Sequence, residues 1–235
     1  MADSPSVVLV HGAFADASGY AGVIRELESS GITVYAPANP LRSLTIDADS
    51  IAAFVSAIPG PVVLVGHSYG GAVITQAGDL PNVTGLVYIA AFGLDVGESA
   101  LSVQEPFPPS ALATSARPTA YDAVGSPGGP EIYIDRAQFV ETFCADLPAD
   151  QAAVMAVAQR AIAAASLGEP ATKAAWKSKP SWFLVATQDH AINPDAERFM
   201  AKRMNATTIE VEASHVVFIS QPKATADLIR AAIAG

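Results

Sequence analysis

Short runs of apolar residues alternate with stretches of helical hydrophobic periodicity along most of the chain. Runs that are apolar at every position are typical of strands covered by helices on both faces, as in a parallel sheet. The pattern therefore predicts an α/β fold, with a doubly wound, mostly parallel sheet of about six strands. The expected strands are residues 7–10, 33–35, 62–65, 85–89, 182–186 and 208–211, and the expected helices are residues 19–29, 46–57, 71–78, 195–204 and 223–234.

The alternation stops between residues 93 and 179. The first half of this segment is rich in turn-forming proline and glycine, up to Pro127, Gly128 and Pro130. A short alternating run at 131–135 and Ala-rich helical patterns at 137–144 and 149–165 follow. A loop this long inside a compact domain is usually functional. We therefore predict a core of residues 1–92 and 180–235 with a lid insertion at 93–179; a purely structural subdomain is the alternative.

Composition fits one globular domain, since 51% of the 235 residues are hydrophobic and only 15% are charged. The net charge of −10 is spread along the chain and disfavours nucleic acid or an anionic membrane as a partner. The single cysteine, Cys144, excludes an intramolecular disulfide and fits a reducing compartment. No basic stretch precedes the apolar run at 7–10, which is too short for a signal peptide or membrane span. We expect a cytoplasmic monomer or homodimer.

The most informative motif is Gly66-His67-Ser68-Tyr69-Gly70, which follows an expected strand and opens an expected helix. A Gly-x-Ser-x-Gly turn between a strand and a helix holds its serine in a strained conformation with the hydroxyl exposed. Such a serine is a nucleophile only with a base and an orienting acid, since a hydroxyl reacts poorly near neutral pH. Ser68 is therefore predicted to be the nucleophile.

Two loops beyond strand ends supply the predicted partners of Ser68. His215 follows the last strand and is the predicted base, because this architecture places serine first, acid second and histidine last. Asp189 follows the strand at 182–186 and is the predicted acid, which would orient the imidazole and stabilise its charged form. Asp95, beyond the strand at 85–89, is the rival acid.

An acyl-transfer site also needs hydrogen-bond donors for the developing oxyanion. The Tyr69 amide, directly after the nucleophile, is the first predicted donor. The second is expected in the loop after the first strand, His11-Gly12-Ala13-Phe14, where Gly12 permits a tight turn. The Ala13 amide is the predicted donor, with the Phe14 amide as the alternative and His11 as a structural anchor.

Together these motifs resemble the α/β-hydrolase superfamily, in particular the small-lid branch of plant methyl esterases of the salicylate-binding type and hydroxynitrile lyases. The resemblance rests on the segments 8–13 and 66–71, on Asp189 with Pro194, and on His215 followed by Gln221-Pro222. It implies a Ser68–Asp189–His215 triad and an oxyanion hole of the Ala13 and Tyr69 amides. The family's lyases carry Thr where this chain has Gly12 and Lys where it has Val216, which implies ester hydrolysis here.

We therefore expect a serine-dependent carboxylesterase acting through an acyl-enzyme on small apolar or aryl esters or lactones, without a metal or organic cofactor. Fold does not fix function, so a lyase, a perhydrolase, a cofactor-free oxygenase or a small-molecule receptor retaining the triad remain alternatives. Aromatic side chains of the core and the lid are the expected pocket walls, although each could instead belong to the core. They are Phe14, Phe92, Phe107, Tyr121, Phe139, Trp176 and Phe218.

Overall fold

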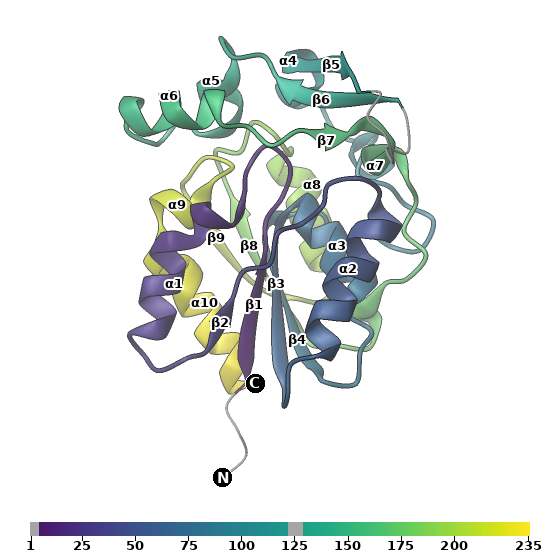
Figure 1. Ribbon diagram of the computed structural model, residues 1–235, viewed down its shortest axis with the longest axis vertical. Coiled ribbons are helices and arrows are strands. Elements are labelled where there is room, and N and C mark those ends of the chain that lie inside the picture. The colour runs from purple at the N-terminus through teal and green to yellow at the C-terminus, as the bar shows by residue number, and fades with distance from the viewer. Residues whose placement is uncertain (1–4, 122–128) are drawn as a thin grey trace.

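The computed structural model describes residues 5–121 and 129–235 (Figure 1). Two parts of the sequence analysis therefore lie outside the described residues. One is residues 1–4, the N-terminal end in which no basic region of a signal peptide was expected. The other is the stretch 122–128, which includes Pro127 and Gly128 of the turn-rich segment.

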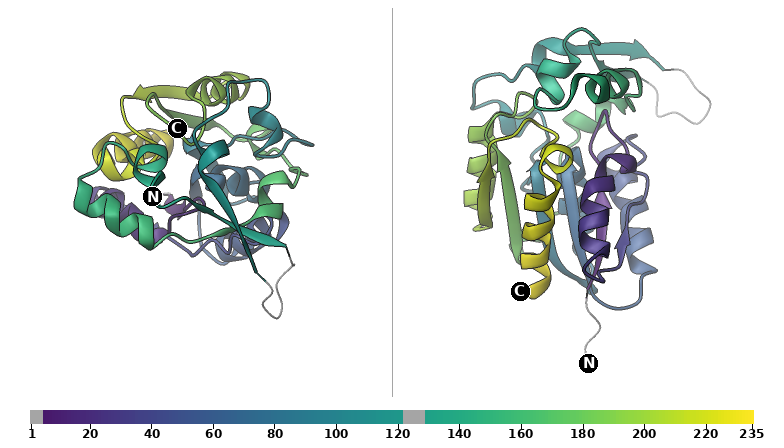
Figure 2. Two further views of the ribbon diagram at one scale, coloured as in Figure 1. Left: turned by 90° about the horizontal axis from the view of Figure 1, so that it is seen from above. Right: turned by 90° about the vertical axis from the view of Figure 1, so that its left-hand side faces the viewer.

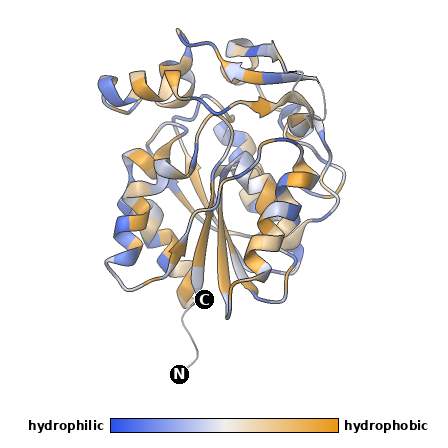
Figure 3. Ribbon diagram, viewed as in Figure 1, coloured by the Kyte–Doolittle hydropathy of each residue, from blue (hydrophilic) through white to orange (hydrophobic). Residues whose placement is uncertain are grey.

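All six predicted strands belong to one parallel sheet, whose strand order is β2-β1-β3-β4-β8-β9. The strand β1 pairs with β2 on one side and β3 on the other, so that Val8 lies opposite Tyr35 of β2 and Leu64 of β3. The predicted fold class is therefore confirmed, and the central strand β3 is buried along its whole length, with an apolar first half (Figure 3). The strands are β1 (Ser6–Val10), β2 (Val34–Tyr35), β3 (Val62–Ser68), β4 (Val83–Ala91), β8 (Ser181–Ala186) and β9 (Thr207–Val211).

Helices cover both faces of this sheet. On one face α1 (Ala21–Glu28) packs against α10 (Pro222–Ala234), and on the other α2 (Leu44–Ser56) packs against α3 (Tyr69–Ala77) (Figures 1 and 2). The helix α8 (Pro194–Arg203) packs beside β8. Within the described ranges, no helix combines the length and the apolarity needed to cross a membrane.

Local signals explain where several of these helices begin. The Ser43 side chain accepts a hydrogen bond from the Ile46 amide and caps α2. Asn193 caps α8 in the same way, through the Asp195 amide. Pro194 occupies the first turn, where a backbone N–H would have no acceptor within the helix, so its absence costs no helical hydrogen bond. The short elements of the core are η1 (Ala17–Tyr20) and α9 (Val217–Ser220).

The inserted segment contains an antiparallel sheet of β5 (Ala116–Ala120), β6 (Pro130–Ile134) and β7 (Ile162–Ala163). This sheet lies over the carboxyl ends of the parallel strands (Figure 1). It is accompanied there by α4 (Leu112–Ser115), α5 (Phe139–Phe143) and α6 (Ala149–Val157). The rest of the segment consists of η2 (Ser102–Gln104), α7 (Ala164–Gly168) and η3 (Ala175–Lys177), of which η3 packs against α3.

The helix expected at 149–165 is wrong in its second half. The helix α6 ends at Val157, and Ile162 pairs with Ile132 as part of the antiparallel sheet. Helix propensity is a weak preference that tertiary pairing overrides, and an Ala-rich stretch gives no sign of a strand partner distant in sequence. The strand β5 was not predicted either, because it contains Pro118 and lies in the turn-rich first half of the segment.

Candidate active site

Ser68 ends the central strand β3 in the strained conformation that its motif predicts. Its backbone has φ 54° and ψ −124°, in a region that non-glycine residues rarely adopt. The two flanking glycines are required by space, not by their own backbone angles. A Cβ on Gly66 would lie 2.5 Å from the Gly70 oxygen, and one on Gly70 would lie 2.3 Å from the Val10 oxygen. Any side chain at either position would displace the turn.

The structure brings His215 and Asp189 into direct contact in the interior. The His215 Nδ1 atom lies 2.5 Å from Asp189 Oδ2, and the two side chains are 1% and 0% exposed. The other Asp189 oxygen, Oδ1, accepts hydrogen bonds from the Ala191 and Ile192 amides at 2.6 Å and 2.9 Å. The carboxylate is thus held on both sides and faces the imidazole.

Asp95, the rival acid, lies elsewhere. Its carboxylate forms an ion pair with Lys177 and accepts a hydrogen bond from the Val96 amide, and its side chain is 29% exposed. Hydrogen bonding to Lys177 lowers the pKa of Asp95. These contacts belong to the surface of the inserted segment, so the geometry favours Asp189 as the partner of His215.

Ser68 and His215 line one small cavity, of about 40 Å³. Ala13, Tyr69, Phe14 and Phe92, all predicted site residues, line it as well. Among the described residues Ser68 and His215 form no direct hydrogen bond, which is common in active sites without substrate. The cavity admits only a few waters or one small chemical group next to the hydroxyl.

The backbone amides around this cavity differ in whether they already donate a hydrogen bond. The Phe14 amide donates a hydrogen bond of 2.9 Å to the Arg160 carbonyl, so it is occupied. The Ala13 amide lies before it on the same turn, and Tyr69 is the first residue of α3, whose amide has no acceptor within the helix. Of the two loop candidates, Ala13 is therefore the better oxyanion donor.

Two buried histidines fix the loops that carry these groups. His11 Nε2 accepts a hydrogen bond from the Asn39 amide at 2.9 Å, while Asn39 Nδ2 donates to the His11 carbonyl at 3.0 Å. His67 lies 2.9 Å through Nε2 from the His215 carbonyl, so it donates there as a neutral ring. Burial lowers the pKa of His67 well below its ordinary value. His67 therefore holds the His215 backbone without carrying charge.

Five aromatic residues expected in the pocket lie outside the lining of this cavity, so that part of the expectation needs correction. Phe139 is fully buried against Phe143, and Phe218 packs between Tyr20 and His67 in the core.

The remaining three of these aromatics belong to the inserted segment and make other contacts. Phe107 packs against Phe199, Tyr121 lies under the Arg42 guanidinium, and the Trp176 indole donates to the Leu94 carbonyl. These three side chains therefore contact other parts of the protein and not the cavity beside Ser68. Such contacts between distant segments cannot be read from the sequence alone.

The residues that take their place were not predicted. Aliphatic and aromatic side chains of the inserted segment close the cavity, together with two residues after Asp189. They are Ala100, Leu101, Gln104, Leu112, Phe143, Leu167, Ala191 and Ile192. Of these residues, only Ala191 and Ile192 could have been predicted from the sequence, because they closely follow the predicted acid Asp189.

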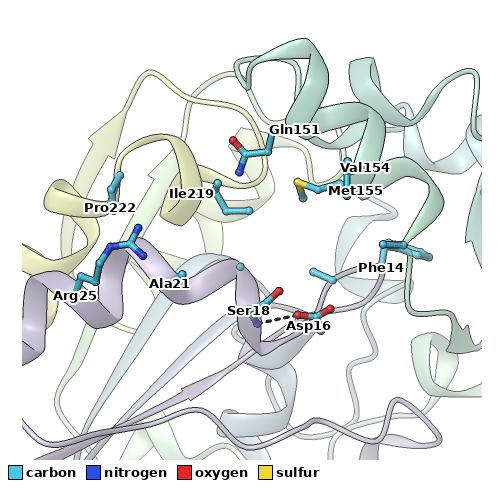
Figure 4. A pocket seen from close by; sticks show the side chains of 14 residues that line it. Phe14, Asp16, Ser18, Ala21, Arg25, Gln151, Val154, Met155, Ile219 and Pro222 are labelled. Carbon is cyan, nitrogen blue, oxygen red and sulfur yellow. Dashed lines mark hydrogen bonds between the residues drawn. The ribbon is translucent and has the colours of Figure 1, made fainter.

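Two larger cavities adjoin this site, and Phe14 lines both. One, of about 380 Å³, shares Leu101, Gln104, Leu112 and Leu167 with the cavity beside Ser68 and is also lined by residues of β5 and β6. The other, of about 410 Å³, lies between α1 and α6 and is lined by Arg25, Gln151 and Met155 among others (Figure 4). Within residues 5–121 and 129–235, no cluster of three or more His, Cys, Asp or Glu side chains could hold a metal ion.

The chain is similar to known proteins over almost its whole length. A model of the alpha/beta hydrolase family matches residues 7–228. The protein named alpha/beta hydrolase nvfD from Aspergillus novofumigatus is 27% identical over 248 residues, covering 96% of this chain and 95% of its own.

Solved structures share the fold. A pyrethroid hydrolase from Sphingobium faniae superposes with a TM-score of 0.79 at 20% identity over 98% of both chains. An extracellular alpha/beta-hydrolase from a Paenibacillus species, described as homologous in structure and function to tobacco salicylic acid binding protein 2, superposes with a TM-score of 0.79 at 24% identity. It covers 97% of this chain and 98% of its own.

These matches confirm the predicted family and its resemblance to the methyl-esterase-like branch. The family model spans the sheet, the inserted segment and most of α10, and the curated relative carries the name of a hydrolase. The match therefore supports an enzyme of the hydrolase class. The chain belongs to the alpha/beta hydrolase family.

Proposed function

We propose that this protein is a serine-dependent hydrolase of carboxylic esters that acts through an acyl-enzyme. One observation carries the proposal: His215, which is paired with the buried Asp189, lines the same small cavity as the strained Ser68. A hydroxyl, an imidazole and a carboxylate in this order are the parts that nucleophilic acyl transfer needs.

In the proposed reaction Ser68 Oγ attacks the ester carbonyl while His215 Nε2 takes the hydroxyl proton. The Ala13 and Tyr69 amides stabilise the oxyanion of the tetrahedral intermediate. His215 then donates the proton to the leaving alcohol, and the Ser68 ester remains. Water, activated by the same imidazole, releases the acid. Asp189 stays ionised and stabilises the transient imidazolium.

The cavities support the proposed substrate class. Their described lining residues include no lysine, arginine, aspartate or glutamate around Ser68, nor in the adjoining 380 Å³ cavity. A charged substrate would be desolvated there without compensation. An apolar or aryl ester fits, with its small part at Ser68 and its larger part beyond Leu101 and Leu167. In this proposal the partner is a small ester or lactone, in the cytoplasm, and not nucleic acid or membrane.

The test is hydrolysis of p-nitrophenyl acetate by the wild type and by Ser68→Ala, with Ser181→Ala as a matched control, since Ser181 is a buried serine at the start of β8 that does not line the cavity. Ser68→Ala should lose at least about 10³-fold in kcat, because the nucleophile is gone. Ser181→Ala should keep most activity. A fluorophosphonate should label Ser68 alone. Saturable ester binding without turnover would replace this proposal with a receptor.

A further inference from the structure

Glu197 is a buried carboxyl with no role in the chemistry described so far. It lies in the first turn of α8 and is 0% exposed. Its Oε2 atom accepts a hydrogen bond of 3.2 Å from the amide of Ala186, the last residue of β8. Among the described residues its Oε1 atom faces no N–H or hydroxyl donor. Its neighbour is a second buried carboxyl, that of Asp189, whose backbone amide donates at 3.2 Å to the carbonyl of the same Ala186 residue.

Two carboxyl groups in contact inside a protein hold a shared proton, because two ionised carboxylates there repel each other and cannot hydrogen-bond. The surrounding donors decide which group is ionised. Asp189 receives the Ala191 and Ile192 amides and the His215 ring. Glu197 receives the Ala186 amide alone. The negative charge is therefore better stabilised on Asp189, which leaves the proton on Glu197.

The charges around Glu197 agree with this placement. Burial, followed by the charge of Asp189, raises the pKa of Glu197 well above its ordinary value. The cation beside it, Arg198, is turned to the surface, where it pairs with Asp195 and Glu210. The His215 ring pairs with Asp189.

We propose that Glu197 is a positioning residue, which remains uncharged and donates its carboxyl proton in a hydrogen bond to the Asp189 carboxylate. This bond holds Asp189 ionised and directed at His215, in a dry site where a charge-assisted hydrogen bond is strong. Glu197 thus forms the outermost member of a chain that runs through Asp189 and His215 to the cavity. The inference rests on the proposed function only for the role of Asp189 as the catalytic acid.

The protonation of Glu197 can be tested without any activity. The infrared difference between the wild type and Glu197→Gln at pH 7 isolates the carboxyl that the substitution removes, since the other carboxyl groups cancel. The expected difference is the C=O stretch of a protonated carboxylic acid, lost in Glu197→Gln. Carboxylate stretches in its place would show that Glu197 is ionised and would overturn the proposal, whatever the enzyme hydrolyses.

Kinetics test the positioning role. Glu197→Gln keeps a neutral donor and an acceptor, so kcat should stay within about threefold, and the acid limb of the pH profile should keep its midpoint. Glu197→Leu removes both, so kcat should fall about tenfold or more with KM little changed, as expected for one lost hydrogen bond to a charge. A midpoint about one pH unit lower in Glu197→Gln would reveal a removed negative charge and contradict the proposal.

Two further outcomes separate this inference from the proposed function. Full activity in Glu197→Leu would show that Asp189 needs no such support, and the positioning role would be abandoned while the esterase remained. If Glu197→Leu does not fold, the infrared difference and the Glu197→Gln profile still decide. An inactive wild type that fluorophosphonate does not label would refute the esterase, and the infrared result would still report on Glu197.

Discussion

The hydroxyl of Tyr69 donates a hydrogen bond of 2.9 Å to the Oδ2 atom of the buried Asp47. The other oxygen of Asp47 accepts from the Arg42 amide at 3.0 Å. Tyr69 is the first residue of α3, and Asp47 lies in the first turn of α2, so the bond joins the starts of two packed helices. It fixes the residue whose amide is the proposed oxyanion donor next to Ser68.

Tyr69→Phe should therefore lower both stability and turnover. Asp47 loses its hydroxyl donor in the interior, which costs about 1–3 kcal/mol in the free energy of unfolding. Loosening of the Tyr69 backbone should reduce kcat several-fold. Tyr88→Phe is a matched control, since it removes a buried hydroxyl bonded to Thr75 away from the cavity. Urea unfolding and ester hydrolysis measure the two effects. Equal losses of kcat in both variants would remove the link to catalysis.

Asp47 should also make stability depend on pH. Burial raises the pKa of Asp47, so the folded state binds its proton more tightly than the unfolded state. This contribution is fully present below the unfolded pKa of about 3.9 and is lost as pH rises toward the folded value. Asp47→Asn cannot ionise and should gain stability relative to wild type from pH 4 to pH 7. Urea unfolding of both proteins across this pH range measures the difference in their free energies of unfolding. A difference that does not change with pH would contradict the raised pKa of Asp47.

The assignment of the acid gives a third prediction. Asp189→Asn should reduce kcat by up to about 10⁴-fold, because an amide no longer holds the imidazole in its working tautomer. Asp95→Asn removes an ion pair with Lys177 at the surface and should change kcat by less than about twofold. Both variants are compared on one ester at saturating concentration. The reverse order would move the acid to the end of β4 and leave Asp189 with only its two amide partners.

Local sequence was sufficient to predict the sheet, and it singled out the three residues of the proposed triad. The inner strands β1, β3, β4 and β8 come from apolar runs because they are buried almost throughout, whereas the edge strands β2 and β9 are partly exposed. Ser68, Asp189 and His215 each follow a strand end, and the carboxyl ends of parallel strands meet at one edge. The contact of Asp189 with His215, and the position of Ser68 at the same cavity, follow from this topology, which the alternating pattern indicates.

Contacts between segments distant in sequence were beyond prediction. Nothing local distinguishes Glu197 from a solvated residue in the first turn of a helix, although its side chain is fully buried and accepts a hydrogen bond from the Ala186 amide at the end of β8. Phe143 lines the cavity and Phe139 supports it from behind, yet both belong to one short helix of similar residues. Which of the two side chains faces the cavity depends on how the inserted segment packs on the core. Helix propensity does not determine this packing.

The cavity predicts which substitutions change substrate size preference. Leu167 lines both the 40 Å³ and the 380 Å³ cavities, so Leu167→Trp should narrow the passage between them. KM for bulky aryl esters should rise about tenfold or more, while hydrolysis of p-nitrophenyl acetate changes little. Val154→Trp is the control, since it projects into the separate cavity beside α1 (Figure 4). An equal effect of Leu167→Trp on every ester would show that the larger cavity holds no part of the substrate.

The choice between hydrolysis and cyanohydrin cleavage depends on two positions beside the proposed triad. Gly12 lies so close to the nucleophile that a Cβ there would be 2.7 Å from the Ser68 Cβ and 2.8 Å from the His67 oxygen. A threonine, which the lyases of the resembled branch carry here, does not fit this backbone. Val216 is fully buried directly after His215, where those lyases carry a lysine.

We therefore expect hydrolysis of small aryl or short-chain esters and no cleavage of mandelonitrile or acetone cyanohydrin above background. A departing cyanide anion needs a nearby cation, and the described lining of the cavity contains none besides the His215 imidazole. Cyanide release is measured beside ester hydrolysis, with Ser68→Ala as the control for both. The substitution Val216→Lys by itself should not produce lyase activity, because Gly12 supplies no hydroxyl at the position where the lyases carry that of threonine. Efficient cyanide release that disappears in Ser68→Ala would replace the esterase with a lyase.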